Sequence, residues 1–335
     1  MSIGELIMNT MVSINCIAYN QERYISDAIE GFLRQQTDFG YEILIHDDAS
    51  TDRTAGIIED YTRRYPDLIK PLYQTENQYS KGIKVGTAFN LPRAKGKYVA
   101  FCEGDDYWTD PEKLQKQVDY MESHPECSMC CHAVKLVNRG GRSVGRLIRP
   151  YHQSCLVPIE DLIMGGGTFI SINSILYRRE LMASPPDFYL QAPVGDIPML
   201  LYLSTCGTVY YFDEVMSAYR TGVSGSWTDR INRSKAKEID TRIRLIEMTD
   251  SFNRFTDYMY ADIITRRQYE NELLLLIARG EVTALKEERF RHIGDQMGIY
   301  AVVLIYLNKY FPHLYRKLKP LKRYLSKKLS ALDRS

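Results

Sequence analysis

The 335-residue sequence lacks the features that would place it in several protein classes. Its seven cysteines are odd in number and irregularly spaced, so they do not form the disulfide framework of a small secreted domain. Its 43 basic and 42 acidic residues leave a net charge of +1, so the whole chain is not an electrostatic binder of nucleic acid. With 44% hydrophobic and 25% charged residues, it is typical of folded globular proteins rather than of disordered or fibrous ones.

An export signal and a long apolar run are also missing. The segment MSIGELIMNTMVSINC at the start has neither a basic region nor an apolar core. The longest uncharged apolar run, 297–307, falls well short of the roughly 20 residues that a helix needs to cross a bilayer. We therefore expect a protein of the reducing cytoplasm.

The glycine-rich loops that most often bind nucleotides are absent as well. No G-x-G-x-x-G follows the first predicted strand, and no G-x-x-x-x-G-K-[ST] occurs anywhere in the sequence. Both absences argue against hydride transfer and against P-loop phosphoryl transfer.

What the first hundred residues contain is an alternation of strand and helix patterns. Strands are predicted at 12–18, 41–46, 68–73 and 97–102, and helices at 22–34, 51–65 and 85–92. This alternation predicts an α/β fold with an open, mostly parallel sheet and right-handed crossovers.

The pattern changes further along the chain. Strands predicted at 127–137 and 207–212 are separated by glycine-rich loops, which indicates α+β content. After about residue 232 the pattern is helical, with helices predicted at 234–248, 262–278 and 281–292. We therefore predict a first domain over 1–230 and a helical C-terminal region over 231–335.

Carboxylates follow the predicted strands directly. The second strand is followed by Asp47-Asp48, and the fourth by Glu103-Gly104-Asp105-Asp106. Open parallel sheets bind ligands at the carboxyl ends of their strands. Oxygen ligands in a loop suit Mg²⁺ or Mn²⁺, which in turn suits a diphosphate. The competing interpretation is a simple turn before a helix that Asp110 caps.

Two other patterns are weaker. Cys127, Cys130, Cys131 and His132 have the spacing of half a zinc site, but no second ligand pair follows, and the alternation fits a half-buried strand. His46 lies inside the second predicted strand, where we expect a packed core residue.

Four segments, in this order, resemble the family 2 glycosyltransferases, which have the GT-A fold. They are VSINCIAYNQERYISDAIEGFLRQ, YEILIHDDASTDRT, GKYVAFCEGDDYW with PEKL after it, and GDIPMLLYLSTCGTVYYFDEVMSAYR. The resemblance covers about residues 11–225. It implies a nucleotide-binding half over 11–110, an acceptor half over 111–230 and inverting, metal-dependent transfer of a sugar from a nucleotide diphosphate, expected to be UDP, to a hydroxyl acceptor. In family terms this reaction serves the assembly of a surface polysaccharide or similar glycan.

The resemblance also implies roles for single residues. Tyr19 matches the position whose ring packs on the donor base, and Asp48 the acid that accepts a hydrogen bond from the base. Lys84 is expected to contact the ribose or the diphosphate. Asp105 is assigned to the ribose or the metal and Asp106 to the metal, Mn²⁺ or Mg²⁺. In this D-x-D segment Glu103 replaces the usual first Asp.

In the acceptor half, Asp196 matches the acid of the family's Gly-Asp or Glu-Asp pair at a helix start. The resemblance makes it the general base, which takes the proton of the acceptor hydroxyl because a hydroxyl is a poor nucleophile at neutral pH. Its sequence position also suits a helix cap. Tyr219-Arg220 matches the family's Tyr-Arg pair, but Gly222 stands where many members have His, so no role of that His is implied.

Rival functions remain open. A sugar-phosphate nucleotidyltransferase shares the α/β sheet and the acids, but it requires a glycine-rich basic loop where this chain has Tyr19-Asn20-Gln21-Glu22. A non-catalytic nucleotide-sugar-binding relative is a second alternative, against which Asp196 argues. A purely structural membrane-associated protein would leave the acidic strand ends unexplained.

The last 27 residues differ from the rest in charge. Residues 309–335 contain nine Lys/Arg and one acid, Asp333, a net +8, so residues 1–308 carry −7. Aromatic and Leu residues alternate there with the basic ones, which predicts a basic amphipathic helix on an anionic membrane surface. The alternative is a helix packed on the protein with its basic face in water. Acceptors in this family are often lipid-linked, so we expect a cytoplasmic protein that is peripheral on the inner face of the membrane.

Overall fold

The computed structural model describes residues 10–279 and, beyond them, 281, 287–288, 306–307, 310–311 and 313–314. The chain divides into two compact units, residues 1–229 and 230–335, which are described separately. The predicted helix at 281–292, the apolar run at 297–307 and the basic tail at 309–335 lie largely outside the described residues.

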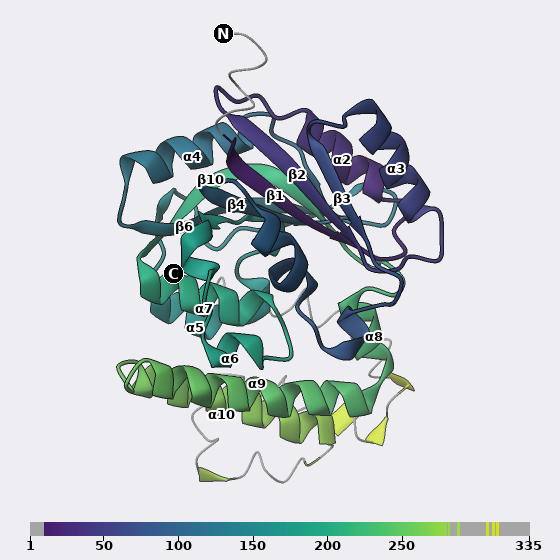
Figure 1. Cartoon of the computed structure of the whole chain (residues 1–335). Coiled ribbons are helices and arrows are strands. Elements are labelled where there is room, and N and C mark those ends of the chain that lie inside the picture. Colours follow the sequence, from purple (N-terminus) through teal and green to yellow (C-terminus); the bar gives the residue numbers. More distant parts are fainter. Residues whose placement is uncertain are drawn as a thin grey trace. The chain divides into compact units, whose positions relative to one another are not determined.

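The first unit contains a twisted sheet that begins with four parallel strands (Figure 1). They pair in the order β3-β2-β1-β4 and are β1 (Thr10–Ala18), β2 (Gly40–Asp47), β3 (Ile69–Tyr73) and β4 (Tyr98–Glu103). β1, β2 and β4 are buried along most of their length because both faces of the sheet are covered there, whereas the edge strand β3 is only partly buried. These are the strands predicted at 12–18, 41–46, 68–73 and 97–102.

The second half of the sheet mixes directions. β9 (Leu176–Arg178) joins β4 to β6 (Cys127–Val137) in antiparallel fashion, whereas β10 (Thr208–Arg220) runs parallel to β6. Three short strands add antiparallel pairings: β5 (Tyr107–Trp108), β7 (Ser143–Ile148) and β8 (Cys155–Leu156). The expectation of a mostly parallel sheet therefore applies to the first four strands, and the whole is a mixed α/β sheet.

Helices flank this sheet. The longer ones that precede β10 are α2 (Ile25–Leu33), α3 (Thr54–Arg64), α4 (Lys113–Ser123) and α7 (Asp196–Cys206). The shorter ones are α5 (Ile159–Gly165), α6 (Asp187–Leu190), η1 (Tyr79–Lys81), η2 (Gly86–Asn90), η3 (Leu91–Arg93), η4 (Gly166–Thr168), η5 (Ile172–Ser174) and η6 (Arg179–Met182). α8 (Trp227–Arg233) follows β10.

α2 packs closely against β5, the strand that directly follows residues 103–106, which we call the acidic loop. Phe32 meets Trp108 edge to face at 4.8 Å between ring centroids. A Cβ at Gly31 would lie 2.9 Å from the backbone N of Trp108, so only glycine permits this approach. Burial of the Phe32 side chain contributes about 1.5–3 kcal/mol of stability.

Asp110, which the sequence suggests as a helix cap, lies before the N-cap position of α4, and Asp52 likewise lies before that of α3. α3 begins after Arg53 and α4 after Glu112, and neither of these residues caps with its side chain. Asp52 lies one residue before the N-cap and accepts a hydrogen bond from Thr54 N at 2.9 Å, whereas Asp110 lies two residues before it and accepts one from Glu112 N at 2.8 Å. Both acids therefore order the turn before the helix.

The second unit contains α9 (Lys235–Phe255) and α10 (Ala261–Arg279), which pack against each other as a hairpin. Ser234 caps α9 by accepting a hydrogen bond from Lys237 N, in agreement with the predicted start at 234. Across the described part of the chain, no helix combines the length and the apolarity needed to cross a membrane.

Candidate functional site

Three strand ends meet at one edge of the sheet. Ala18 pairs with Asp47 between β1 and β2, and Ile17 pairs with Glu103 between β1 and β4. The alignment continues past the strands, because Asp48 N donates to Ala18 O at 2.9 Å and Gly104 N donates to Ile17 O at 2.9 Å. The loops that begin at Tyr19, Asp48 and Gly104 therefore leave neighbouring strands at the same edge.

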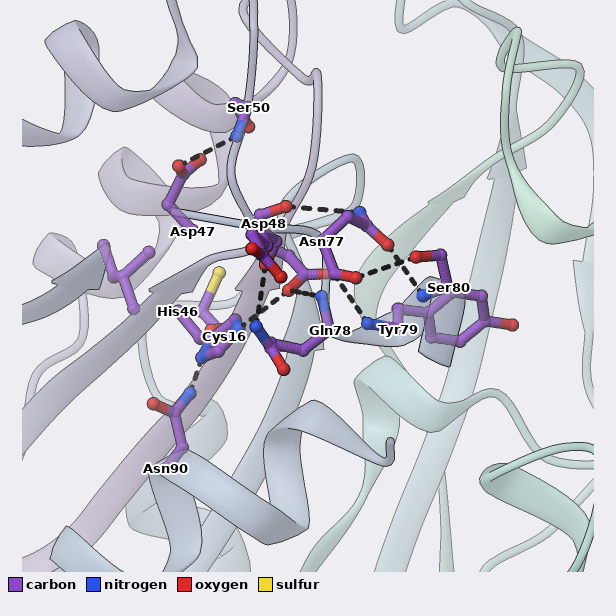
Figure 2. A network of polar contacts seen from close by, with 12 residues as sticks. Cys16, His46, Asp47, Asp48, Ser50, Asn77, Gln78, Tyr79, Ser80 and Asn90 are labelled. Carbon is purple, nitrogen blue, oxygen red and sulfur yellow. Dashed lines mark hydrogen bonds and ion pairs between the residues drawn. The ribbon is translucent and has the colours of Figure 1, made fainter. Parts of the chain in front are cut away.

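Asp48 accepts hydrogen bonds from a turn about 30 residues later in the chain and so holds that turn in place (Figure 2). Its Oδ1 accepts a hydrogen bond from Gln78 N at 2.8 Å, and its Oδ2 one from Tyr79 N at 3.0 Å. Its backbone carbonyl accepts a further bond from Asn77 Nδ2 at 3.2 Å. Asp48 thus holds residues 77–80, which we call the 77–80 turn, over the end of β2.

His46, a residue of β2, contacts the Asp48 carboxylate. It is fully buried, and its Nε2 lies 3.3 Å from Asp48 Oδ1. Burial lowers the pKa of His46, an effect that neighbouring Asp48 opposes. The imidazole is therefore neutral at pH 7 and donates through Nε2–H. The prediction of a packed core residue is confirmed for its burial, but the sequence did not indicate this hydrogen bond.

Tyr19 lies on a loop that is joined to the Asp48 loop. The residue is 39% exposed. The next residue, Asn20, has a φ of +54°, and its Oδ1 accepts a hydrogen bond from Thr51 N at 2.7 Å. Asn tolerates this left-handed conformation better than most residues. The two loops are thus held together while the Tyr19 ring stays accessible to a planar ligand.

Asn90, which sequence reasoning missed, fixes η2 against the sheet. Its Nδ2 lies 2.8 Å from Asn15 Oδ1, 3.1 Å from Cys16 O and 3.1 Å from Leu44 O. It therefore links η2 to both β1 and β2. No periodicity marks a lone Asn with this role, so the sequence offered no signal for it.

The two adjacent aspartates of the acidic loop differ in environment. Asp106 is 1% exposed, and its carboxylate accepts hydrogen bonds from Arg220 N at 2.8 Å and from Asn173 Nδ2 at 2.9 Å. Burial raises the pKa of Asp106, and the charge of Asp105 adds to this effect. Asp105 is half-buried, and burial raises its pKa to about 6 while Arg220 opposes the rise.

Arg220 holds the acidic loop in place. Its guanidinium donates to Asp105 O at 2.9 Å, to Arg139 O at 3.1 Å and to Asp27 Oδ2 at 2.6 Å. The rings of Tyr24 and Tyr107 lie 4.7 and 5.2 Å from it. The Tyr219-Arg220 motif of the sequence thus contributes an arginine that connects β10 to the loop after β4.

The acidic loop fits a divalent cation that a substrate helps to bind. Among the described residues, no group of three or more His, Cys, Asp or Glu could hold a metal ion unaided. Within the same part of the chain, no other residue donates a hydrogen bond to the Asp105 carboxylate. Mg²⁺ is commonly bound by one or two carboxylates together with substrate phosphates. Asp105 is therefore suited to share a cation with a diphosphate.

The half zinc site gains no support. Cys127, Cys130, Cys131 and His132 are buried along β6, and the cysteines are free thiols. His132 Nδ1 lies 2.9 Å from Ala133 O, which occupies that nitrogen.

Asp196 is the first residue of α7. Gly195 occupies the N-cap position without a side-chain hydrogen bond, so Asp196 lies one residue inside the helix rather than at the cap position that its sequence also suits. Burial raises the pKa of Asp196, and the positive charge of Lys84 opposes this rise. A Cβ at Gly167 would lie 3.2 Å from Asp196 Oδ2, so the absence of a side chain there leaves room beside the carboxylate.

Lys84 reaches the loop in front of α7. Its Nζ donates to Ala192 O and to Val194 O, each at 2.9 Å. The structure thus brings Lys84, which precedes η2, close to Asp196 at the start of α7. The loops that carry Tyr19, Asp48 and Asp105 leave neighbouring strands at the same end of the sheet.

A mixed sheet with a parallel N-terminal half, flanking helices and an acidic loop after its fourth strand defines a protein of the GT-A glycosyltransferase fold. The profile of the family described as glycosyl transferase family 2 matches residues 13–182, and the chain belongs to this family.

The chain is also similar in sequence to several bacterial proteins, two of which are named as glycosyltransferases. The uncharacterized protein Rv1520 of Mycobacterium tuberculosis is 38% identical over 65% of this chain, which spans 62% of that protein's length. The uncharacterized glycosyltransferase alr2836 of Nostoc sp. is 37% identical over 72% of this chain and 74% of its own. The putative teichuronic acid biosynthesis glycosyltransferase TuaG of Bacillus subtilis is 33% identical over 63% of this chain and 79% of its own.

Solved structures share the fold. The mannosyltransferase PcManGT from Pyrobaculum calidifontis, in complex with GDP-Man and Mn²⁺, has a TM-score of 0.55 at 17% identity and covers 97% of this chain and 86% of its own. Residues 1–349 of S. aureus TarS, in complex with UDP-GlcNAc, give a TM-score of 0.53 at 18% identity and cover 89% and 87% of the two chains.

Proposed function

We propose that this protein is an inverting glycosyltransferase that moves a sugar from UDP to a hydroxyl acceptor in the assembly of a surface polysaccharide or related glycan. The observation that supports it best is the single sheet edge where the loops of Tyr19, Asp48 and Asp105 meet. The name of TuaG, a teichuronic acid biosynthesis glycosyltransferase, supports a glycan product.

The donor base is proposed to bind between Tyr19 and Asp48. The exposed ring of Tyr19 offers a stacking surface. A carboxylate has about four lone-pair sites. At Asp48, the bonds from His46, Gln78 N and Tyr79 N occupy three of them. One site remains for a base N–H, which suits uracil because its ring presents a single N–H to such an acceptor.

The diphosphate is proposed to bind at the acidic loop with Mn²⁺ or Mg²⁺. When bound, such a cation stabilises the negative charge that develops on the leaving phosphate. Asp105 and Asp106 were both predicted as ligands. We propose that Asp105 is the direct ligand and that Asp106 holds the loop, because Arg220 N and Asn173 already donate to the Asp106 carboxylate.

Asp196 is proposed as the general base. Its carboxylate takes the proton of the acceptor hydroxyl while the hydroxyl oxygen forms a bond to the anomeric carbon. The bond from that carbon to the diphosphate oxygen breaks, and its electron pair leaves with the diphosphate. A base is most effective when its pKa lies near the working pH, so the raised pKa of Asp196 favours this role.

The test is Asp196→Asn, which keeps the shape but removes the base. We expect turnover to fall by about 10²–10⁴-fold while affinity for the UDP-sugar stays nearly unchanged. The matched control is Asp187→Asn, since exposed Asp187 is also the first residue of a short helix, α6. Loss of donor affinity with turnover of bound donor retained would contradict the base assignment.

The rival functions give different results in the same assays. A sugar-phosphate nucleotidyltransferase would be stabilised against heat by a nucleoside triphosphate with Mn²⁺ but not by UDP. A non-catalytic relative would bind UDP-sugars without transferring or hydrolysing them. A screen of nucleotide sugars for metal-dependent hydrolysis would also identify the donor sugar.

A further inference from the structure

Lys84 connects the hydrogen-bonded start of η2 to the loop that leads into the proposed general base. The loop 191–195 joins α6 to α7 and directly precedes Asp196, the first residue of α7. Two of its carbonyl groups, Ala192 O and Val194 O, accept hydrogen bonds from the Lys84 ammonium at 2.9 Å each. Lys84 therefore contacts this loop at two points within four residues of Asp196.

The backbone of Lys84 is itself held by hydrogen bonds. The Lys84 carbonyl accepts hydrogen bonds from Thr87 N at 3.0 Å and Ala88 N at 2.8 Å, at the start of η2. η2 in turn is linked to the sheet through Asn90, and Asn15 Nδ2 donates to Gly86 O at 3.3 Å. The ammonium thus extends from a backbone that β1 and β2 immobilise.

A second contact joins the same two segments. Thr87 Oγ1 and Tyr189 Oη lie 2.5 Å apart, and the Lys84 ammonium lies 5.3 Å from the centre of the Tyr189 ring. Tyr189 is buried in α6, directly before the loop. The start of η2 is therefore joined to the 187–195 segment both before and after Gln191, the first residue of the loop.

We propose that Lys84 is a positioning residue for Asp196: by binding Ala192 O and Val194 O it fixes the loop that sets the place of the carboxylate. This rests on the proposed function and gives Lys84 a role beyond the donor contact predicted from sequence. A displacement of about 1 Å at a reacting group can lower a rate by about 10²-fold, so two hydrogen bonds to the preceding loop affect catalysis directly. The nearby positive charge also favours the ionised form of Asp196, which a base requires.

The test compares Lys84→Met with Lys84→Arg. Lys84→Met should lower kcat by about 10–100-fold, leave the dissociation constant of UDP with Mn²⁺ within about twofold, and shift the acid limb of the kcat/KM profile to higher pH. The shift has this sign because removal of a positive charge raises the pKa of Asp196. Lys84→Arg, whose guanidinium can still donate to both carbonyls, should restore part of kcat.

Lys81→Met is the matched control, because Lys81 lies in the same segment but pairs with Glu76 at the surface. It should behave like the wild type. If Lys84→Met weakens UDP binding tenfold or more and leaves the acid limb in place, Lys84 contacts the donor and the positioning role is overturned.

A readout without catalysis separates this proposal from the proposed function. In hydrogen–deuterium exchange of the free protein, Lys84→Met should accelerate exchange of the amides in 191–197, while Lys81→Met should not. Unchanged exchange there would overturn the positioning role even in an active enzyme. Faster exchange in a protein that transfers no sugar would support the positioning role and contradict the proposed function instead.

Discussion

Two neighbouring residues of the same type have different environments in this protein. Asp106 has both carboxylate oxygens engaged by donors from η5 and β10, whereas Asp105 is only half-buried and has no such partners among the described residues. The sequence could not order them, because both follow the same strand. The distinction depends on Asn173 and Arg220, which lie 67 and 114 positions away from Asp106 along the chain.

Substitution should separate the two aspartates. Asp105→Asn should abolish the thermal stabilisation by UDP with Mn²⁺ and leave the free energy of unfolding of the free protein nearly unchanged. Asp106→Asn should lower that free energy by about 1–3 kcal/mol, because its amide group would face another donor. Chemical denaturation and thermal shift, each with and without EDTA, measure both effects. An Asp106→Asn protein with wild-type stability and no response to Mn²⁺ would reverse the assignment.

Lys113 is a buried cation with a predictable pH effect. It is the first residue of α4 and is fully buried. Its Nζ donates to Gln117 Oε1 at 2.6 Å and lies 4.1 Å from the centre of the Trp108 ring. Burial lowers its pKa from 10.5 to about 7. Between these values the unfolded chain binds the proton and the folded chain does not, so this group's contribution to stability rises with pH.

We therefore expect the unfolding free energy of the wild type, relative to Lys113→Met, to increase from pH 7 to pH 9. The slope should reach up to about 1.4 kcal/mol per pH unit. Denaturant titrations at three pH values measure it. Lys116→Met, on the same helix but with a raised pKa of about 12, should show no such slope. A flat difference for Lys113→Met as well would mean that Lys113 stays charged when folded.

At the scale of elements, the 77–80 turn depends on the end of β2. Two backbone amides of the turn donate to one carboxylate, that of Asp48, and a side-chain amide donates to its carbonyl. In Figure 2 these contacts converge on Asp48. Removing that carboxylate leaves both amides without their acceptor, so the turn should become mobile.

Asp48→Ala should accelerate cleavage by trypsin after Lys81, the last residue of η1, and should weaken UDP binding by about 10-fold or more. Limited proteolysis with mass spectrometry, together with equilibrium binding, measures both. Asp67→Ala, at an exposed position between α3 and β3, is the control. If cleavage after Lys81 keeps its wild-type rate in Asp48→Ala, the turn is held by other contacts.

The sequence predicted the elements whose residues form long, continuous patterns. The first four strands were found because each is an apolar run that ends in polar residues, and α2 because Ile25, Ile29 and Phe32 recur at helical spacing. The three-residue strand β9 was missed, since three residues are too few to show a period. The same limit hid the two-residue strands β5 and β8.

Candidate site residues were predicted where they follow a strand, and their hydrogen-bond partners were missed where these come from loops. Asp48 and Asp105 stand directly after apolar runs, which made them visible. Asn90 and Asn173 act through single amide groups, and the loop contact of Lys84 depends on a fold that brings residues 84 and 192 together. Contacts of this kind follow from packing, which no local pattern encodes.

At the scale of the whole molecule, charge is divided unevenly along the chain. Residues 1–308 carry −7 and residues 309–335 carry +8, so the net charge of +1 hides two opposite contributions. An anionic surface attracts the tail and repels the rest, which favours one orientation on a membrane. This orientation would serve transfer to a lipid-linked acceptor, the kind of acceptor that the family resemblance implies.

Deletion of 309–335 should release the protein from anionic liposomes while soluble donor hydrolysis persists. Each basic residue near such a surface contributes about 1 kcal/mol, so a net +8 suffices even if half the charges lie far from the headgroups. Sedimentation of the full-length and truncated proteins with anionic and neutral liposomes, at low and high salt, measures the effect. A full-length variant in which all nine Lys and Arg residues of 309–335 are replaced by Ser separates charge from length. Because the attraction is electrostatic, this variant should sediment like the truncated protein, and high salt should release the wild type. Equal sedimentation of full-length and truncated proteins under all conditions would rule out the tail as the membrane contact.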